Sequence, residues 1–154
     1  MAATETHSVS SSKLAEQAFL AVLRAADGLQ ASLAAMLEPH GLSPTQYNAL
    51  RILRGAGREG LACQEIGERM INRDPDITRL LARLDRRSLV RRSRDRKDRR
   101  IIKARISAAG LKLLNSLDPE IESFHHQLMG RLPEKDLELL IRLLPGAVNT
   151  QQAA

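Results

Sequence analysis

The chain has 154 residues, a hydrophobic fraction of 43%, a net charge of +6 and one cysteine. This hydrophobic fraction supports a folded core, and a single thiol excludes an internal disulfide framework or a zinc knuckle. The sequence has no secretory signal pattern and no run of about 18 apolar residues, so we expect a soluble, cytoplasmic protein with no membrane partner.

The positive charge is concentrated in residues 83–105. This window holds twelve lysines and arginines and three aspartates, a balance of +9, so the rest of the chain sums to −3. Charge localised in this way creates a directed positive field to which a polyanion such as nucleic acid responds.

The first predicted elements are a tail and a long helix. Residues 1–12 are rich in Ser and Thr and are expected to be disordered, as is the short polar segment 149–154. Over residues 13–37, apolar side chains recur at three- and four-residue steps, which predicts an amphipathic helix that ends near Pro39 and Gly41.

Two shorter helices should follow. Residues 43–46 read Ser-Pro-Thr-Gln, which combines a capping box with a proline in the first turn and predicts a helix start. A third helix is predicted over residues 63–70, with Ile66 and Met70 facing inward.

A fourth helix is predicted to begin at Asp74 and Pro75, which favour the N-cap and the first helical position. Its apolar residues share one face: Ile77, Leu80, Leu81 and Leu84. Its basic residues share the opposite face: Arg79, Arg83 and Arg86. One side of this helix should therefore pack against a core while the other presents guanidinium groups.

After Val90 the apolar pattern changes from helical to alternating. Ile102, Ala104 and Ile106 alternate with basic residues, as a half-buried strand requires. Between the two strand candidates, residues 94–100 contain no apolar side chain. We therefore predict a two-stranded hairpin with a charged tip.

The remaining chain predicts two helices. Ser107 is expected to cap a long helix that kinks or divides at Pro119. A last amphipathic helix should start at about Pro133.

Two short helices followed by a basic hairpin suit double-stranded DNA. The second helix fits the major groove, and an arginine at the hairpin tip can enter the narrow minor groove. The candidate DNA-binding residues of the reading helix are Arg73, Asp76, Thr78, Arg79 and Arg83. Those of the hairpin, or wing, are Arg94, Arg96, Lys97, Asp98, Arg99 and Arg100.

These segments resemble the MarR family of regulators. Residues 76–84 with 89–90 are similar to the family's recognition helix and first wing strand. Residues 98–100, then 106–107 and Gly110, are similar to its wing signature of Asp-x-Arg, a Leu-Thr pair and a Gly.

The resemblance implies a mainly α fold with a small β-wing. A winged helix-turn-helix core at residues 42–106 would be flanked by dimerisation helices at residues 13–37 and 107–148. It also implies a homodimer and a small aromatic or anionic effector, whose binding residues stay unknown. Arg100 would enter the minor groove, and Asp98 would pair with it to hold its side chain.

The sequence departs from the family at two helix ends. Ser88 stands where a glycine usually follows the recognition helix, so that helix end should be capped differently. Ala62 stands where a Ser or Thr often caps the third helix. Cys63 is expected to be an inert thiol, with redox sensing as the alternative.

Other function classes fit less well. No nucleophile elbow, phosphate loop, metal-ligand spacing or acid–base pair is found, so we expect no enzyme, cofactor or metal site. A single-stranded nucleic-acid binder would stack bases on aromatic rings, and none of Phe19, Tyr47 and Phe124 lies in the basic window. We expect a sequence-specific regulator, a repressor, on a palindromic operator. The alternatives are an interaction module without ligand sensing and a non-specific nucleic-acid binder.

Overall fold

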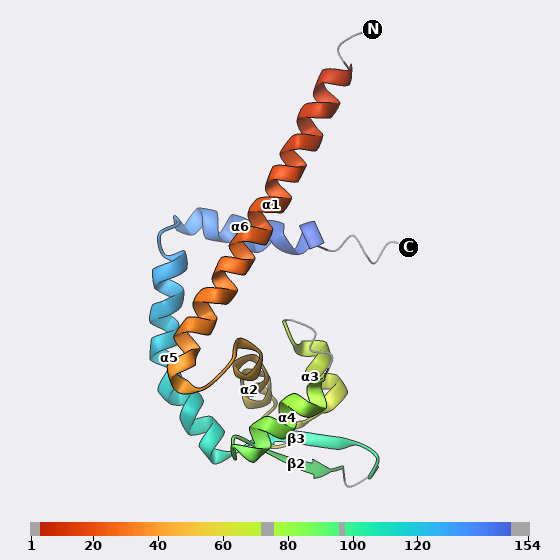
Figure 1. Ribbon diagram of the computed structural model, residues 1–154, viewed down its shortest axis with the longest axis vertical. Coiled ribbons are helices and arrows are strands. Elements are labelled where there is room, and N and C mark those ends of the chain that lie inside the picture. Colours follow the sequence, from red (N-terminus) through yellow and green to blue (C-terminus); the bar gives the residue numbers. More distant parts are fainter. Residues whose placement is uncertain (1–3, 72–75, 96–97, 149–154) are drawn as a thin grey trace. The chain divides into compact units, whose positions relative to one another are not determined.

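The structure is a computed structural model that describes residues 4–71, 76–95 and 98–148 (Figure 1). The chain divides into two compact units, Met1–Ser107 and Ala108–Ala154. The elements of the first unit are α1 (Thr4–Leu37), the 3₁₀ turn η1 (Glu38–His40), α2 (Pro44–Ala56), β1 (Leu61–Ala62), α3 (Cys63–Arg69), α4 (Ile77–Arg86), β2 (Val90–Arg94) and β3 (Ile102–Ile106). Those of the second unit are α5 (Ala108–Met129) and α6 (Glu134–Val148). The expected mainly α fold with a small β-wing is confirmed.

Helix α1 begins at Thr4, earlier than the predicted start at residue 13. The expected disorder therefore does not hold for residues 4–12, because no Pro or Gly interrupts the chain before Gly28. The other residues assigned to tails, 1–3 and 149–154, lie outside the described residues.

The end of α1 follows the prediction. The helix stops at Leu37, and Pro39 lies in the 3₁₀ turn that comes next. Gly41 closes this turn with a positive φ of 66°, and its amide donates to the Glu38 carbonyl.

The segment Ser11–His40 is long and apolar enough, by length and composition, to cross a membrane. The expectation of no uninterrupted run of about 18 apolar residues still holds for this segment, because Lys13, Glu16, Arg24 and Asp27 interrupt it. Several of its apolar side chains are exposed, among them Leu14 at 68% and Phe19 at 62%. An exposed apolar surface of this size calls for a covering surface, whether protein or lipid.

Helix α2 begins as predicted. The Ser43 hydroxyl accepts from the Gln46 amide at 3.2 Å, and the Gln46 side chain accepts from the Ser43 amide at 3.1 Å. This capping box satisfies two amide groups that the first helical turn leaves without partners. The buried face of α2 supplies Tyr47, Ala49, Leu50 and Leu53 to the core.

Helices α3 and α4 form the helix-turn-helix. Helix α3 starts after Ala62, whose amide donates to the Glu65 carboxylate at 2.7 Å, so the Glu65 half of a capping box is present although Ala62 has no hydroxyl to supply the other half. Ile66 is buried on α3, and Met70 is buried directly after it, as predicted.

Helix α4 begins later than the predicted start at Asp74 and Pro75, which lie outside the described residues. Asp76 is the N-cap, and its Oδ1 accepts from the Arg79 amide at 2.9 Å. Asp76 has a carboxylate oxygen that can cap a helix and directly precedes Ile77, the first residue of the apolar face.

The wing is part of a three-stranded antiparallel sheet with the order β1-β3-β2. In the predicted hairpin, Val90 lies opposite Ile106 and Arg94 lies opposite Ile102. The short strand β1 pairs with the other edge of β3 and was not predicted. Gly60 permits this pairing because its φ is +67° and a Cβ there would collide with the Ala104 carbonyl.

The second unit is helical. Helix α5 runs without a break through Pro119, so the predicted division at that residue does not occur. Its buried residues recur at helical spacing: Gly110, Leu114, Leu117 and Ile121. Helix α6 follows, close to the predicted start at Pro133.

Helix α4 ends in a left-handed turn at Ser88, where φ is 58°. The Ser88 amide donates to the Asp85 carbonyl at 2.8 Å, and the Leu89 amide donates to the Leu84 carbonyl at 3.0 Å. This pair of bonds is the Schellman motif, in which glycine usually holds the left-handed position. Serine therefore carries a Cβ penalty at the turn that leads from α4 to the wing.

We expect Ser88→Gly to raise the free energy of unfolding by about 0.5 to 1 kcal/mol, because glycine adopts a positive φ without a Cβ clash. The Ser88 carbonyl accepts from the Ser107 hydroxyl at 2.6 Å, and this bond survives the substitution. Urea unfolding at one fixed protein concentration measures the change, with Ser88→Val as a comparison that should be less stable than the wild type. An equal or lower free energy for the glycine variant would show that the turn is not strained.

Candidate nucleic-acid interface

Helix α4 has two different faces. Leu80, Leu81 and Leu84 are buried, and Ile77 is half-buried. The exposed residues include three of the predicted reading residues: Thr78, Arg79 and Arg83. The predicted division between a packed side and a cationic side is confirmed.

Asp76, a fourth predicted reading residue, has a structural task. Besides capping α4, its Oδ2 lies 3.6 Å from the Arg79 Nε, with side-chain exposures of 52% and 70%. A pair this exposed contributes little to stability, but it restrains the direction of the Arg79 side chain. The remaining predicted residue of this group, Arg73, lies outside the described residues.

The wing tip is a turn organised by two aspartates. The Asp95 amide donates to the Ile101 carbonyl at 2.8 Å, and the Ile101 amide donates to the Asp98 carbonyl at 3.0 Å. The Asp95 Oδ1 accepts from the Asp98 amide at 3.1 Å. Side chains of this type commonly replace backbone acceptors in turns.

Asp98 and Arg100 are connected differently from the expectation. The Asp98 Oδ1 accepts from the backbone amide of Arg100 at 2.9 Å, and these two described residues form no ion pair between their side chains. Asp98 therefore orders the backbone beneath Arg100 and leaves the guanidinium group exposed.

The other wing arginines have different surroundings. The Arg94 Nη1 donates to the Arg99 carbonyl at 3.3 Å, so Arg94 braces the tip across its base. Arg99 is exposed beside Arg100. Arg96 and Lys97 lie outside the described residues.

Asp95 and Lys103 form an ion pair that sequence reasoning missed. The Lys103 Nζ lies 2.7 Å from the Asp95 Oδ2. This hydrogen bond, and next the charge of the Asp95 carboxylate, raises the pKa of Lys103 above its ordinary value of 10.5. The hairpin register is the feature that could have revealed this ion pair, because Ser93 lies opposite Lys103 and Asp95 follows Ser93 by two residues.

The cationic surface continues along the wing sheet. A polar hollow of about 490 Å³ opens there. Its lining residues are Arg58, Glu59, Ser93, Arg94, Asp95, Lys103, Ala104 and Arg105. Four of these side chains are basic and two are acidic, so this surface favours an anion.

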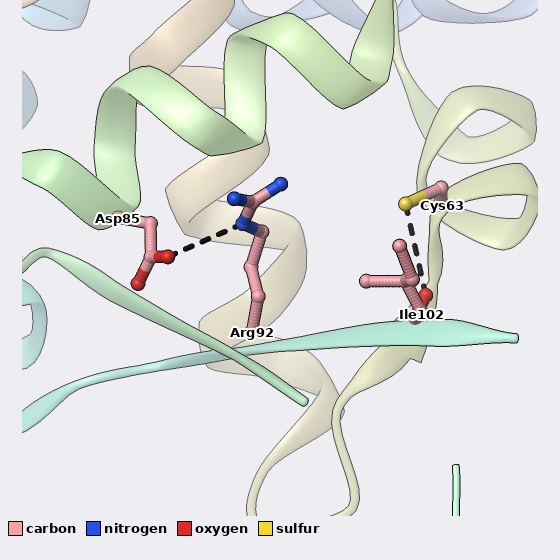
Figure 2. Close-up of polar contacts among 4 residues, drawn as sticks. All are labelled: Cys63, Asp85, Arg92 and Ile102. Carbon is pink, nitrogen blue, oxygen red and sulfur yellow. Dashed lines mark hydrogen bonds and ion pairs between the residues drawn. The ribbon is translucent and has the colours of Figure 1, made fainter. Parts of the chain in front are cut away.

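Two polar contacts join the helices to the wing strands (Figure 2). The Arg92 Nε of β2 donates to the Asp85 Oδ2 of α4 at 3.2 Å. The Cys63 Sγ of α3 lies 3.6 Å from the Ile102 carbonyl of β3 and donates a weak hydrogen bond. Neither pair of partners could be predicted from the sequence, because both contacts link segments that come together only in the fold.

We expect Asp95→Asn to lower the pKa of Lys103 towards 10.5, because the amide keeps the shape of the carboxylate but loses its charge. The pKa of Lys103 is raised in the folded state, so its stabilising effect is complete below pH 10.5 and is lost as the pH rises through the raised value. An NMR titration of the Lys103 side chain measures this shift. Glu59→Gln is the matched control, because Glu59 raises the same pKa by charge alone and less strongly. Equal midpoints in the wild type and Asp95→Asn would rule out the pair in solution.

Comparison with known proteins gives a consistent result. The sequence profile of the MarR family matches residues 42–102. The chain is 38% identical to a MarR transcription factor from Planctomyces limnophilus, and the two structures superpose with a TM-score of 0.68 over 84% of this chain and 94% of that one. It is 27% identical over 126 residues to the HTH-type transcriptional regulator MhqR of Bacillus subtilis, covering 82% of this chain and 86% of that protein.

The fold is also shared with a protein solved on DNA. The Staphylococcus aureus MepR–DNA complex matches with a TM-score of 0.73 at 21% identity, over 84% of this chain and 93% of that chain. At this identity the likeness concerns the fold alone. Together with the exposed arginine face of α4 and the ordered wing, the matches above lead to one conclusion: the chain belongs to the MarR family of winged helix-turn-helix transcriptional regulators.

Proposed function

We propose that this protein is a cytoplasmic repressor that binds a palindromic operator as a homodimer. The observation that carries the proposal is the division of α4, whose leucines are buried while Thr78, Arg79 and Arg83 are exposed. Two such helices in successive major grooves would lie about 34 Å apart, one turn of the duplex.

Each element of the interface has a distinct role in this proposal. Arg79 and Arg83 contact base edges and phosphates, and Thr78 contacts a phosphate near the start of α4. Arg99 and Arg100 enter the minor groove from the tip that Asp98 orders. Arg73, Arg96 and Lys97 would add phosphate contacts. With about eight phosphates contacted per dimer, the logarithm of affinity falls with the logarithm of salt with a slope of about −7.

Dimerisation would cover the exposed apolar side chains of the flanking helices. On α1 these include Leu14, Phe19 and Leu23, and on α6 they include Ile141 and Leu143. Helices that build an interface between subunits carry such surfaces, whereas a monomer in water rarely exposes them in such number. A dimer would thus explain the apolar composition of α1 without a membrane.

A small effector would act by favouring one dimer geometry over another. A hollow of about 480 Å³ lies at the start of α2. Its lining residues are Ala34, Ala35, Glu38, Gly41, Leu42, Ser43 and Pro44. The one charged side chain among these is acidic, so this hollow suits an apolar or aromatic effector better than an anion. Arg87, directly after α4, donates to the Gly41 carbonyl and connects this hollow to the reading helix.

We expect Arg79→Ala to weaken binding to a specific duplex by about 10- to 100-fold, because a bidentate base contact discriminates by about 1 to 3 kcal/mol. The duplex is first enriched from a random-sequence library by the wild-type protein, and fluorescence anisotropy then gives the affinity. Arg51→Ala is the matched control, since it removes an equal charge from an exposed position on α2.

Sedimentation of the same mixtures gives the stoichiometry, which should be two protomers per duplex. Unchanged affinity of Arg79→Ala would contradict the assigned reading face. Failure of the wild type to enrich any sequence would contradict the function itself.

A further inference from the structure

An aspartate occupies an unfavourable position on the reading helix. Asp85 lies in the last turn of α4, where the helix dipole disfavours negative charge and where Arg83 and Arg86 are the expected residue type. Its side chain is 32% exposed, and its Oδ2 accepts from the Arg92 Nε at 3.2 Å. The aspartate therefore requires a partner, and that partner comes from the wing.

Arg92 is equally unexpected on its strand. It lies opposite Ala104, which is buried, and two residues after Val90, which is also buried. Alternation places Arg92 on the same inward face of β2, where an apolar residue would pack. Its side chain instead extends towards α4 and meets Asp85, as Figure 2 shows.

The chain between Asp85 and Arg92 contains the turn at Ser88. Without a contact across it, this turn would act as a hinge between α4 and the wing. Ser88 and Leu89 hold the near end of the hairpin, because the Ser107 hydroxyl donates to the Ser88 carbonyl at 2.6 Å and the Ser107 amide donates to the Leu89 carbonyl at 3.0 Å. These bonds hold the base of the hairpin. Further along the sheet, β3 is held by its pairing with β1 and by the Cys63 contact to the Ile102 carbonyl. The Asp85–Arg92 pair adds the polar contact that links β2 directly to α4.

The required accuracy follows from the length of the wing. Five residues of β2 span about 16 Å at about 3.3 Å per residue. A rotation of about 10° at the base would move the tip by about 3 Å, which is the full length of a hydrogen bond. A wing that is free to rotate by this amount would lose its groove contacts while α4 kept its own.

We propose that the Asp85–Arg92 ion pair is a positioning contact that sets the wing against the reading helix, so that both reach the same duplex together. It determines specificity without either residue reading a base. This inference rests on the proposed function, and it assigns a role to two residues that the reading face and the wing tip do not include.

The test compares four full-length variants: Asp85→Asn, Arg92→Gln, the exchange Asp85→Arg with Arg92→Asp, and the control Glu122→Gln. The control adds the same net charge as Asp85→Asn at an exposed position on α5, outside the candidate interface. The probes are the duplex enriched by the wild type and mixed-sequence calf thymus DNA. Thermal unfolding confirms that each variant is folded.

We expect both single variants to lose about tenfold in affinity for the enriched duplex, within the range of couplings between contacting residues. Asp85→Asn should bind mixed-sequence DNA at least as tightly as the wild type, because it gains positive charge. The two variants change net charge in opposite directions, so an equal loss of specificity in both excludes charge as the cause. The exchange should restore the specific affinity to within about threefold.

A second measurement separates positioning from simple stability. In the wild type, Arg100→Ala should cost about tenfold in specific affinity, whereas in Asp85→Asn it should cost less than about threefold, because the wing is no longer held in place. Additive losses would overturn the proposal. It would also be overturned if Asp85→Asn matched Glu122→Gln on the enriched duplex, or if a folded exchange variant failed to recover.

If the wild type enriches no sequence, the proposed function fails and this inference fails with it. If the wild type enriches a sequence and the Asp85 and Arg92 variants bind it as tightly as the wild type does, only the inference fails.

Discussion

The burial of three leucines on α4 determines the direction in which its arginines point. Leu80, Leu81 and Leu84 are each at most 5% exposed. Burying a leucine side chain contributes about 1.5 to 3 kcal/mol, so the three together contribute about 5 to 9 kcal/mol. That amount is comparable with the whole stability of an ordinary domain. The helix therefore cannot rotate about its axis without unfolding the unit, and Arg79 and Arg83 stay on the solvent side before any DNA is present.

The same unit has to hold many like charges close together. Residues 83–105 contain three acids, and the structure gives each of them a contact within the window. Asp85 meets Arg92, Asp95 meets Lys103, and Asp98 accepts from the Arg100 amide. Asp85 and Asp95 thus neutralise cations at the base and frame of the wing, whereas Asp98 orders the backbone of its tip. The arginines at its tip keep their charge exposed.

Sequence periodicity and helix-end chemistry predicted most of the fold. The two faces of α4, the capping box at Ser43 and the strand predicted from the alternating residues 102–106 follow from local rules, since each depends on residues within one element. Two residues of β1 are too few to display a period, and the strand exists because Gly60 lets the chain approach β3. Local rules placed the start of α4 at Asp74, whereas Asp76 is its N-cap. They also ended the N-terminal tail too late, because serines and threonines are tolerated in a helix that nothing interrupts.

The contacts of the candidate site were less predictable than its charge. The arginines were predictable, since composition and spacing display them, but the contacts of Asp85 and Asp95 that arrange them were not. Asp85 and Arg92 are seven residues apart across a turn, and Cys63 and Ile102 are thirty-nine apart. Such partners depend on the angle between α4 and the wing strands, which neither element encodes alone. The resemblance to the family suggested an Asp98–Arg100 side-chain pair, and the structure shows how the same two residues interact through the backbone instead.

The bonds between Ser107 and the residues Ser88 and Leu89 close the wing at its base. The two ends of the hairpin are therefore hydrogen-bonded to each other, and these bonds do not depend on the residues of the hairpin tip. Residues can be added to or removed from its tip without displacing the end of α4 or the point at which the chain leaves for α5. The length of the wing tip is in this way separated from the geometry of the remaining DNA-binding unit. Related regulators with the same closure could acquire new operators by changing the length of one surface loop.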